Sequence, residues 1–140
     1  CLETYVSATG ICRTTAELLA GYNTDSLLAK IPYEEITSKG VYEAALSGDT
    51  IALRAFDITA EILGKALADL TAVLSPEAIF LFGGLANAGD MLLNSVKQIM
   101  EENLLYLYKN KVQLLSSDLP QGHAAVLGAS ALIRSELKKR

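Results

Sequence analysis

The stretch IFLFGGLANAGD, residues 79–90, predicts a buried strand, a tight turn and a helix start in direct succession. Four large apolar residues are typical of a strand covered on both faces of a sheet. Gly83 and Gly84 follow at the carboxyl end of this strand, where open α/β sheets place their ligands, and glycine there permits a close approach to the backbone. Asn87 is expected to cap the next helix, with Asp90 in support. A simple chain turn explains the two glycines equally well.

The composition predicts one compact globular domain over residues 1–140. Hydrophobic residues make up 51% of the chain and charged residues 20%, which argues against disorder. The net charge is −4, and a solvated terminus explains the basic run 138–140 at least as well as contact with nucleic acid. No apolar run is long enough for a bilayer, so we expect no membrane contact and a cytoplasmic location. A chain that starts with Cys1 is expected to be processed or part of a longer protein.

Apolar periodicity predicts three helices before the strand. The first covers residues 2–19 and is bent or broken near Gly10, the second runs from Thr37 or Ser38 to about residue 46, and the third runs from about 49 to 74. The third helix is apolar on most of its surface, which indicates burial on most sides. We interpret its one charged stripe as a solvated edge with helical ion pairs, formed by Arg54, Asp57, Glu61, Lys65 and Asp69.

After the strand, the pattern predicts a helix following Asn87, a second strand at 111–115 and a last helix that starts between 121 and 124. Two consecutive βα units imply neighbouring parallel strands, so the fold class is α/β, rich in helix with a small parallel sheet. Small residues in the last helix are expected to let it lie close against another element. An incomplete sheet and apolar helix faces predict a homo-oligomer, most simply a symmetric dimer.

Few residues carry recognisable chemistry. His123, at the expected start of the last helix, is best interpreted as neutral and hydrogen-bonded. Cys12 is expected to be a small buried thiol, and Cys1 stands without the further ligands that a zinc site needs. From the residues alone, the interpretation ends at a nucleotide- or ligand-facing turn at Gly83 and Gly84.

The sequence resembles the ROK family of bacterial sugar kinases, which includes glucokinases, and of related sugar-responsive repressors. The segment CLETYVS, residues 1–7, resembles the end of the family signature C-x-C-G-x-x-G-C-x-E. The resemblance continues in order along the whole chain, through EAALSGD (43–49), PEAIFLFGG (76–84) with AGD (88–90), and AVLGA (125–129). Each motif is short, but their common order is specific.

The resemblance implies an ATP-dependent kinase of the actin-like ATPase superfamily, in which two ribonuclease-H-like lobes close over ATP and a hexose. This chain would be most of the C-terminal lobe. Gly83 and Gly84 match glycines that contact adenosine, Glu3 matches an acid that binds sugar hydroxyls, and Cys1 matches the last of the zinc cysteines. The cofactors implied are ATP with Mg²⁺ and a structural zinc in the full-length protein.

Several family motifs would precede residue 1. They include the phosphate loop, the catalytic Asp and the other zinc ligands, so we expect no catalytic residue and no phosphoryl transfer in the chain by itself. A family repressor would share this lobe and would bind nucleic acid through a domain that lies upstream. Kinase and repressor therefore remain alternatives, as does a non-catalytic dimerisation fragment with apolar surface uncovered.

Overall fold

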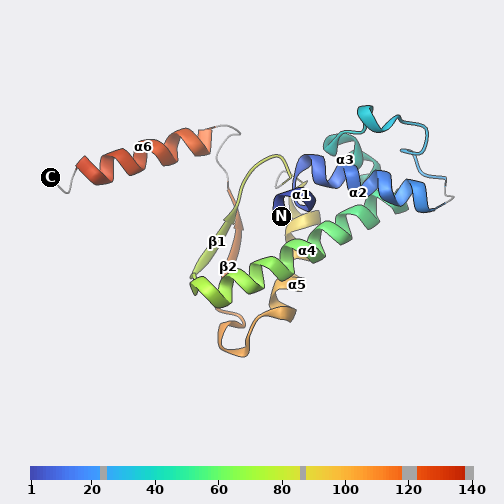
Figure 1. Cartoon of the computed structure of the whole chain (residues 1–140). Helices are drawn as coiled ribbons and strands as arrows, with labels where there is room; N and C mark the ends of the chain where they lie inside the picture. The colour runs from blue at the N-terminus through green and yellow to red at the C-terminus, as the bar shows by residue number, and fades with distance from the viewer. Residues whose placement is uncertain (23–24, 86–87, 118–122, 138–140) are drawn as a thin grey trace.

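The computed structural model describes residues 1–22, 25–85, 88–117 and 123–137. Figure 1 shows a group of helices beside a small two-stranded sheet, with the last helix set apart from both. The elements are α1 (Leu2–Tyr5), α2 (Ala8–Gly21), a 3-10 turn (Tyr33–Glu35), α3 (Ser38–Leu46), α4 (Thr50–Leu74), β1 (Ala78–Leu81), α5 (Asp90–Asn103), a second 3-10 turn (Tyr106–Tyr108), β2 (Gln113–Ser116) and α6 (His123–Leu137).

The first predicted helix is two helices, and the break lies before the position expected. The chain leaves α1 at Val6, and the side chain of Ser7 caps α2 by accepting a hydrogen bond of 3.0 Å from the N–H of Gly10. A Cβ atom on Gly10 would overlap the carbonyl oxygen of Tyr5. The glycine therefore allows α1 and α2 to approach closely, whereas the serine cap produces the break.

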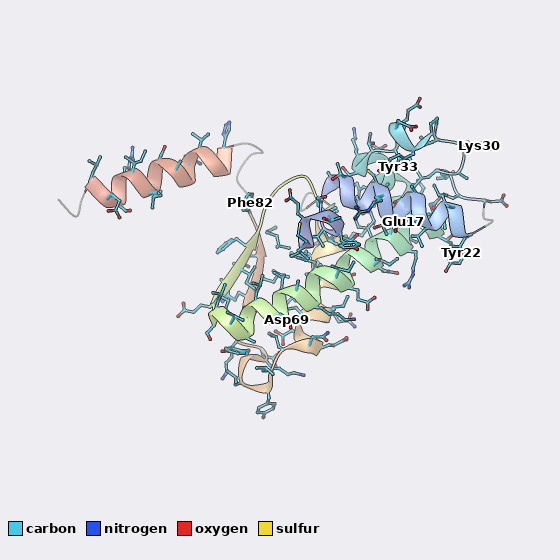
Figure 2. The ribbon with its side chains drawn as sticks, viewed as in Figure 1. Glu17, Tyr22, Lys30, Tyr33, Asp69 and Phe82 are labelled. Atoms are coloured by element: carbon cyan, nitrogen blue, oxygen red, sulfur yellow. The ribbon has the colours of Figure 1, made fainter. Side chains whose placement is uncertain are left out.

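The core forms where α4 packs along α5. Gly64 of α4 lies against Ile99 and the backbone of Val96, and any side chain at position 64 would meet both. On α5 the buried residues are Leu92, Val96 and Met100. The charged stripe of α4 is exposed, as predicted, and its Lys65 and Glu61 form an ion pair of 2.7 Å. Asp69, at the end of the stripe, is labelled in Figure 2.

Asp49 joins the start of α4 to the preceding loop. One carboxylate oxygen accepts hydrogen bonds of 3.0 Å from the N–H groups of Ile51 and Ala52, and the other accepts from the N–H of Leu27 at 2.6 Å and the hydroxyl of Ser26 at 2.9 Å. Burial pushes the pKa of Asp49 upward, but these hydrogen bonds to the charged form outweigh it and leave the pKa below its ordinary value of 3.8. Asp49, at the predicted start of this helix, is thus both its N-cap and a tertiary link.

The two strands pair in parallel, as predicted, with Ile79 opposite Leu114. The expectation that β1 is covered on both faces is wrong within the described residues. Ile79 and Leu81 pack on the core, but Phe80 is 61% exposed because side chains alternate across a strand and only one face has helices against it. Phe82, which follows β1 (Figure 2), is 69% exposed.

The C-terminal end of α4 is also less buried than expected, since Val73 and Leu74 are exposed.

Helix α5 differs from the sequence expectation in its N-cap, and helix α6 differs in its packing. The N-cap of α5 is Gly89, with no side-chain cap, and the expected cap Asn87 lies outside the described residues. Helix α6 begins at His123 as predicted, but its described side chains are exposed and Figure 1 shows it pointing away from the other elements. The close packing expected for α6 is therefore absent among the described residues. None of the described helices is long and apolar enough to cross a membrane.

Candidate functional site

The two glycines after β1 have different conformational requirements. Gly83 has a φ of +107°, which L side chains rarely adopt, so the turn itself needs glycine at this position. Gly84 is not among the positive-φ residues, and a Cβ atom added to it would meet no atom of the described residues within 4 Å. The turn interpretation therefore accounts for Gly83, while the fold places no evident demand for glycine on Gly84.

A hollow of about 480 Å³ opens beside Gly84. This size lies within the usual range for small-molecule sites, about 300–1,000 Å³. Its walls come from three parts of the chain: the N-terminal half of α3, one residue of α4 and the segment after β1. The residues that line it are Ser38, Lys39, Tyr42, Phe56, Gly84, Leu85 and Ala88.

Aromatic side chains give the hollow an apolar wall. The rings of Tyr42 and Phe56 meet edge to face, with centroids 6.2 Å apart and planes at 69°. Lys39, at the rim, is largely exposed and lies 3.6 Å from Glu43, so its ammonium group is within reach of solvent and of a bound molecule. A ligand with a flat apolar ring and polar edges would fit this aromatic wall better than a bare phosphate would.

The start of α5, on the other side of the turn, is poorly suited to an anion. Helix N-termini attract phosphate through free N–H groups and the helix dipole. Here the first turn already carries the exposed carboxylate of Asp90, which would repel a phosphate. The electrostatics therefore favour the nucleoside end of a nucleotide near Gly84 over its terminal phosphates.

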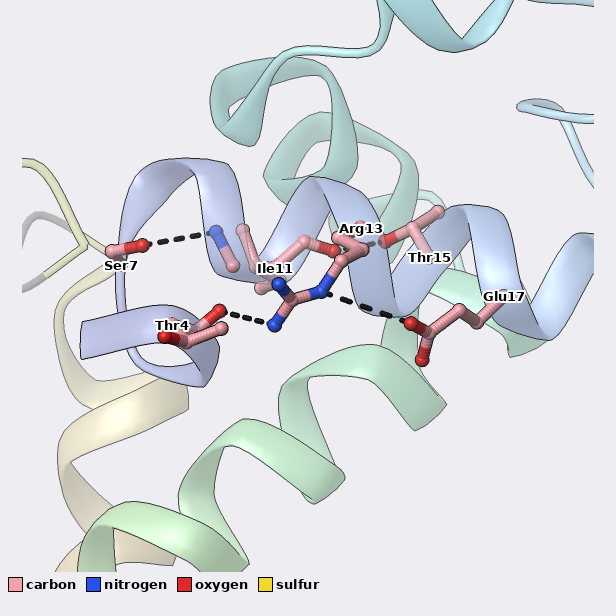
Figure 3. A network of polar contacts seen from close by, with 7 residues as sticks. Thr4, Ser7, Ile11, Arg13, Thr15 and Glu17 are labelled. Carbon is pink, nitrogen blue, oxygen red and sulfur yellow. Dashed lines mark hydrogen bonds and ion pairs between the residues drawn. The ribbon is translucent and has the colours of Figure 1, made fainter. Parts of the chain in front are cut away.

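Cys1 and Glu3 lie together on the N-terminal segment. Both are exposed, and Glu3 makes no hydrogen bond or ion pair with the residues that the structure describes. Cys1 is the N-cap of α1, and its Sγ lies 3.6 Å from Oγ1 of Thr4. Figures 1 and 3 both place α1 beside the start of α5, the helix that follows the glycine turn. Helix α1, which carries Glu3, thus lies near the start of the helix that follows the glycine turn.

The residues present do not fit a zinc site by themselves. Among residues 1–22, 25–85, 88–117 and 123–137, no group of three or more His, Cys, Asp or Glu side chains lies close enough to hold a metal ion. Cys1 would supply one ligand, and a structural zinc needs about four. Cys12 is buried as predicted, and burial raises the pKa of its thiol, which keeps it protonated and unreactive.

Sequence reasoning missed the lining residues Lys39, Tyr42 and Phe56. They lie on two helices that precede the glycine turn by many residues, and each fits an ordinary helix pattern. Tyr42 and Phe56 in particular occupy helix positions that face the core. Only their placement around Gly84 distinguishes them, and no local signal in the sequence marks it.

Comparison with known proteins identifies what the chain is similar to. The model of the ROK family matches residues 1–136. A glucokinase from Halalkalibacterium halodurans is 36% identical over 97% of this chain and 41% of its own length. The DNA-binding transcriptional dual regulator NagC of Escherichia coli is 26% identical over 96% of this chain and 32% of its own length.

A solved structure of a ROK glucokinase from Streptomyces griseus, in complex with glucose and AMPPNP, superposes with a TM-score of 0.81 at 28% identity. The superposition covers 94% of this chain and 44% of the glucokinase chain. This chain therefore spans less than half the length of the relatives it matches. The expected fold class, a helix-rich α/β lobe with a small parallel sheet, is confirmed by this likeness. By its sequence and its fold, the chain belongs to the ROK family.

Proposed function

We propose that residues 1–140 form one domain, the C-terminal lobe of a two-lobe cytoplasmic sugar kinase that transfers the γ-phosphate of ATP to a hexose. The observation that carries this proposal is the hollow beside Gly84, with its aromatic wall of Tyr42 and Phe56. The likeness to glucokinases, one of them in complex with glucose and AMPPNP, supports the choice of ligands.

In this proposal the hollow takes the adenosine of ATP. The base would lie against Tyr42 and Phe56, and the backbone at Gly84 would approach it without an intervening side chain. Gly83 shapes the turn through its positive φ. The carboxylate of Asp90 keeps phosphate groups away from α5, so the phosphates and their Mg²⁺ would extend toward the other lobe.

Glu3 is proposed to bind the sugar. An ionised carboxylate is an acceptor with two oxygens, and charge-assisted hydrogen bonds to two hydroxyls can distinguish epimers. The absence of any competing partner for Glu3 among the described residues is consistent with this role. Cys1 would complete a zinc site only with ligands from outside residues 1–140.

Catalysis would need both lobes. Within the described residues we assign no general base and no phosphate-binding loop, so residues 1–140 contribute binding and not the chemical step. In a coupled assay with a panel of hexoses, the full-length protein should turn over ATP only when a suitable hexose is present. Residues 1–140 by themselves should be inactive. Turnover by this segment comparable with that of the full-length protein would overturn the two-lobe assignment.

A sugar-responsive repressor is the second candidate, and the 26% identity to the regulator of Escherichia coli favours it. A repressor of this kind would bind sugar through the same lobe and DNA through an upstream domain. The two functions differ in a direct measurement: a full-length protein that binds duplex DNA in a sugar-dependent way, and shows no hexose-dependent ATP turnover, would be the repressor.

We also propose that the full-length protein is a homo-oligomer, most simply a dimer. The uncovered apolar side chains at the end of α4 and along α6 support this, because such surfaces are usually buried in an assembly. Light scattering should give at least twice the monomer mass at micromolar concentration. A clean monomer at high micromolar concentration would exclude the dimer.

A further inference from the structure

Arg13 of α2 points back along the chain toward α1, and Figure 3 shows its contacts with Thr4 of α1 and with Glu17 of α2. One guanidinium nitrogen donates a hydrogen bond to the carbonyl oxygen of Thr4. The centre of the guanidinium group lies 5.1 Å from the centre of the Tyr5 ring, within range of a cation–π interaction. Its Nε lies 3.7 Å from a carboxylate oxygen of Glu17, one turn further along α2.

Helix α1 needs such support because it cannot hold its position alone. Helix formation is unfavourable until several turns exist, and α1 spans four residues, none of them buried. Its own backbone provides few hydrogen bonds, including one of 2.9 Å from the N–H of Val6 to the carbonyl of Leu2. The last carbonyls of a helix have no partner within the helix. Arg13 supplies that partner for Thr4, at the end of the helix where a cation is favourable.

The contact depends on the shape of arginine as well as its charge. The planar guanidinium can donate to Thr4, pair with Glu17 and lie over the Tyr5 ring at the same time. A lysine ammonium is a point charge on a flexible stem and cannot make the three contacts together. Gly10 contributes to the same junction, since its lack of a side chain lets α2 reach the Tyr5 carbonyl.

We propose that Arg13 is a positioning residue for sugar binding, because it fixes the helix that carries Glu3. Glu3 directly precedes the two residues, Thr4 and Tyr5, that Arg13 holds. The inference rests on the proposed function, in which Glu3 binds the hexose, and adds a residue that never touches the sugar. Replacing Arg13 does not change the side chain of Glu3, but it lets the Glu3 carboxylate move relative to the sugar hydroxyls.

The test uses the full-length protein with Arg13→Met, Arg13→Lys and a control, Lys65→Gln. The control removes a cation from another i,i+4 pair with glutamate, on α4, and should leave kinetics unchanged. Arg13→Met should lower kcat/KM for the hexose by about ten- to a hundredfold, the scale of a small misplacement, while the KM for ATP stays within about twofold. Arg13→Lys should recover only part of this loss, because it restores charge without the planar geometry.

Two kinetic results would overturn the inference. One is an unchanged kcat/KM for the hexose in Arg13→Met; the other is a parallel loss of hexose and ATP affinity, which indicates general destabilisation. Millisecond hydrogen exchange over residues 2–6 provides a second readout: the amides should exchange faster in Arg13→Met than in wild type or Lys65→Gln, and equal rates would show that Arg13 does not hold α1. If wild-type protein lacks hexose-dependent turnover, the proposed function fails and the sugar role of Arg13 fails with it. The exchange rates would then still decide whether Arg13 holds the helix.

Discussion

A Cβ atom on Gly64 of α4 would lie 2.8 Å from the Cβ of Ile99 on α5, closer than real Cβ atoms approach. It would also lie 3.0 Å from the carbonyl oxygen of Val96, which belongs to the backbone and cannot rotate away. Helices α4 and α5, which supply half of the buried core cluster, therefore touch through a glycine. Their spacing is set by the absence of a side chain at position 64.

Gly64→Ala should consequently destabilise the fold. Alanine gains about 1 kcal/mol of helix propensity over glycine, but overpacking a fitted contact costs about 1–3 kcal/mol, and backbone on one side limits relaxation. We expect the free energy of unfolding to fall by up to about 2 kcal/mol in urea titrations, which is the overpacking cost less the gain in helix propensity. Gly21→Ala is the control, since a Cβ there meets none of the residues that the structure describes within 4 Å, and it should be neutral or slightly stabilising. Equal effects of the two changes would contradict the close helix contact.

Asp49 should make stability depend on pH in the acid range. Its pKa is below 3.8 in the folded protein, so its contribution is fully present above about pH 5 and is lost as pH falls through 3.8 toward the folded-state pKa. Asp49→Asn should lower the free energy of unfolding by about 1–3 kcal/mol at pH 7, because an amide cannot accept all four hydrogen bonds. The difference between variant and wild type should shrink near pH 3 in urea titrations.

Glu61 provides the matched control for this pH effect. The hydrogen bond and charge of Lys65 also lower the pKa of Glu61, but its carboxylate is solvent-exposed. Water and salt screen such a pair, so Glu61→Gln should change stability far less than Asp49→Asn does. If Glu61→Gln lowered the free energy of unfolding as much as Asp49→Asn does, the buried hydrogen bonds of Asp49 would contribute no more to stability than an exposed ion pair.

Gly84→Val separates the ligand role of this glycine from a role in the turn. A Cβ atom at Gly84 would meet none of the described residues within 4 Å, so the melting temperature should hardly change. If adenosine occupies the adjacent hollow, the added side chain crowds it, and the KM for ATP should rise much more than the KM for the hexose in the full-length protein. Unchanged Michaelis constants with a lower melting temperature would instead indicate a simple turn.

Glu3→Gln should weaken hexose use selectively. A lost hydrogen bond to a charged group corresponds to about 1.5–3 kcal/mol, so kcat/KM for the hexose should fall roughly ten- to two-hundredfold in the full-length protein, with little change in ATP affinity. The structural alternative is that Glu3 merely stabilises the first turn of α1 as an acid at a helix start. In that case stability drops slightly, hexose kinetics stay intact, and Glu3 is not a sugar ligand.

The sequence by itself determined most of the longer elements and their order. Thr37 and Asp49 were identifiable as helix starts because cap residues act on N–H groups within their own turn, and both accept those hydrogen bonds in the structure. The parallel pairing of β1 with β2 followed from the βα order, since a crossover of this length brings the strands side by side in the same direction. These features depend on interactions between residues close in sequence or on chain connectivity.

The tertiary structure decided what depends on contacts between distant residues. The sequence placed a break near Gly10, but only the fold shows that this glycine admits the Tyr5 carbonyl and that Ser7 makes the break. The sequence marked Gly84, whereas the aromatic wall of Tyr42 and Phe56 comes from helices α3 and α4 folded around it. The exposure of Phe80 could not be predicted from the sequence either, because an apolar residue in a strand does not indicate whether another element covers it. Local patterns specify elements, and packing alone specifies which surfaces meet.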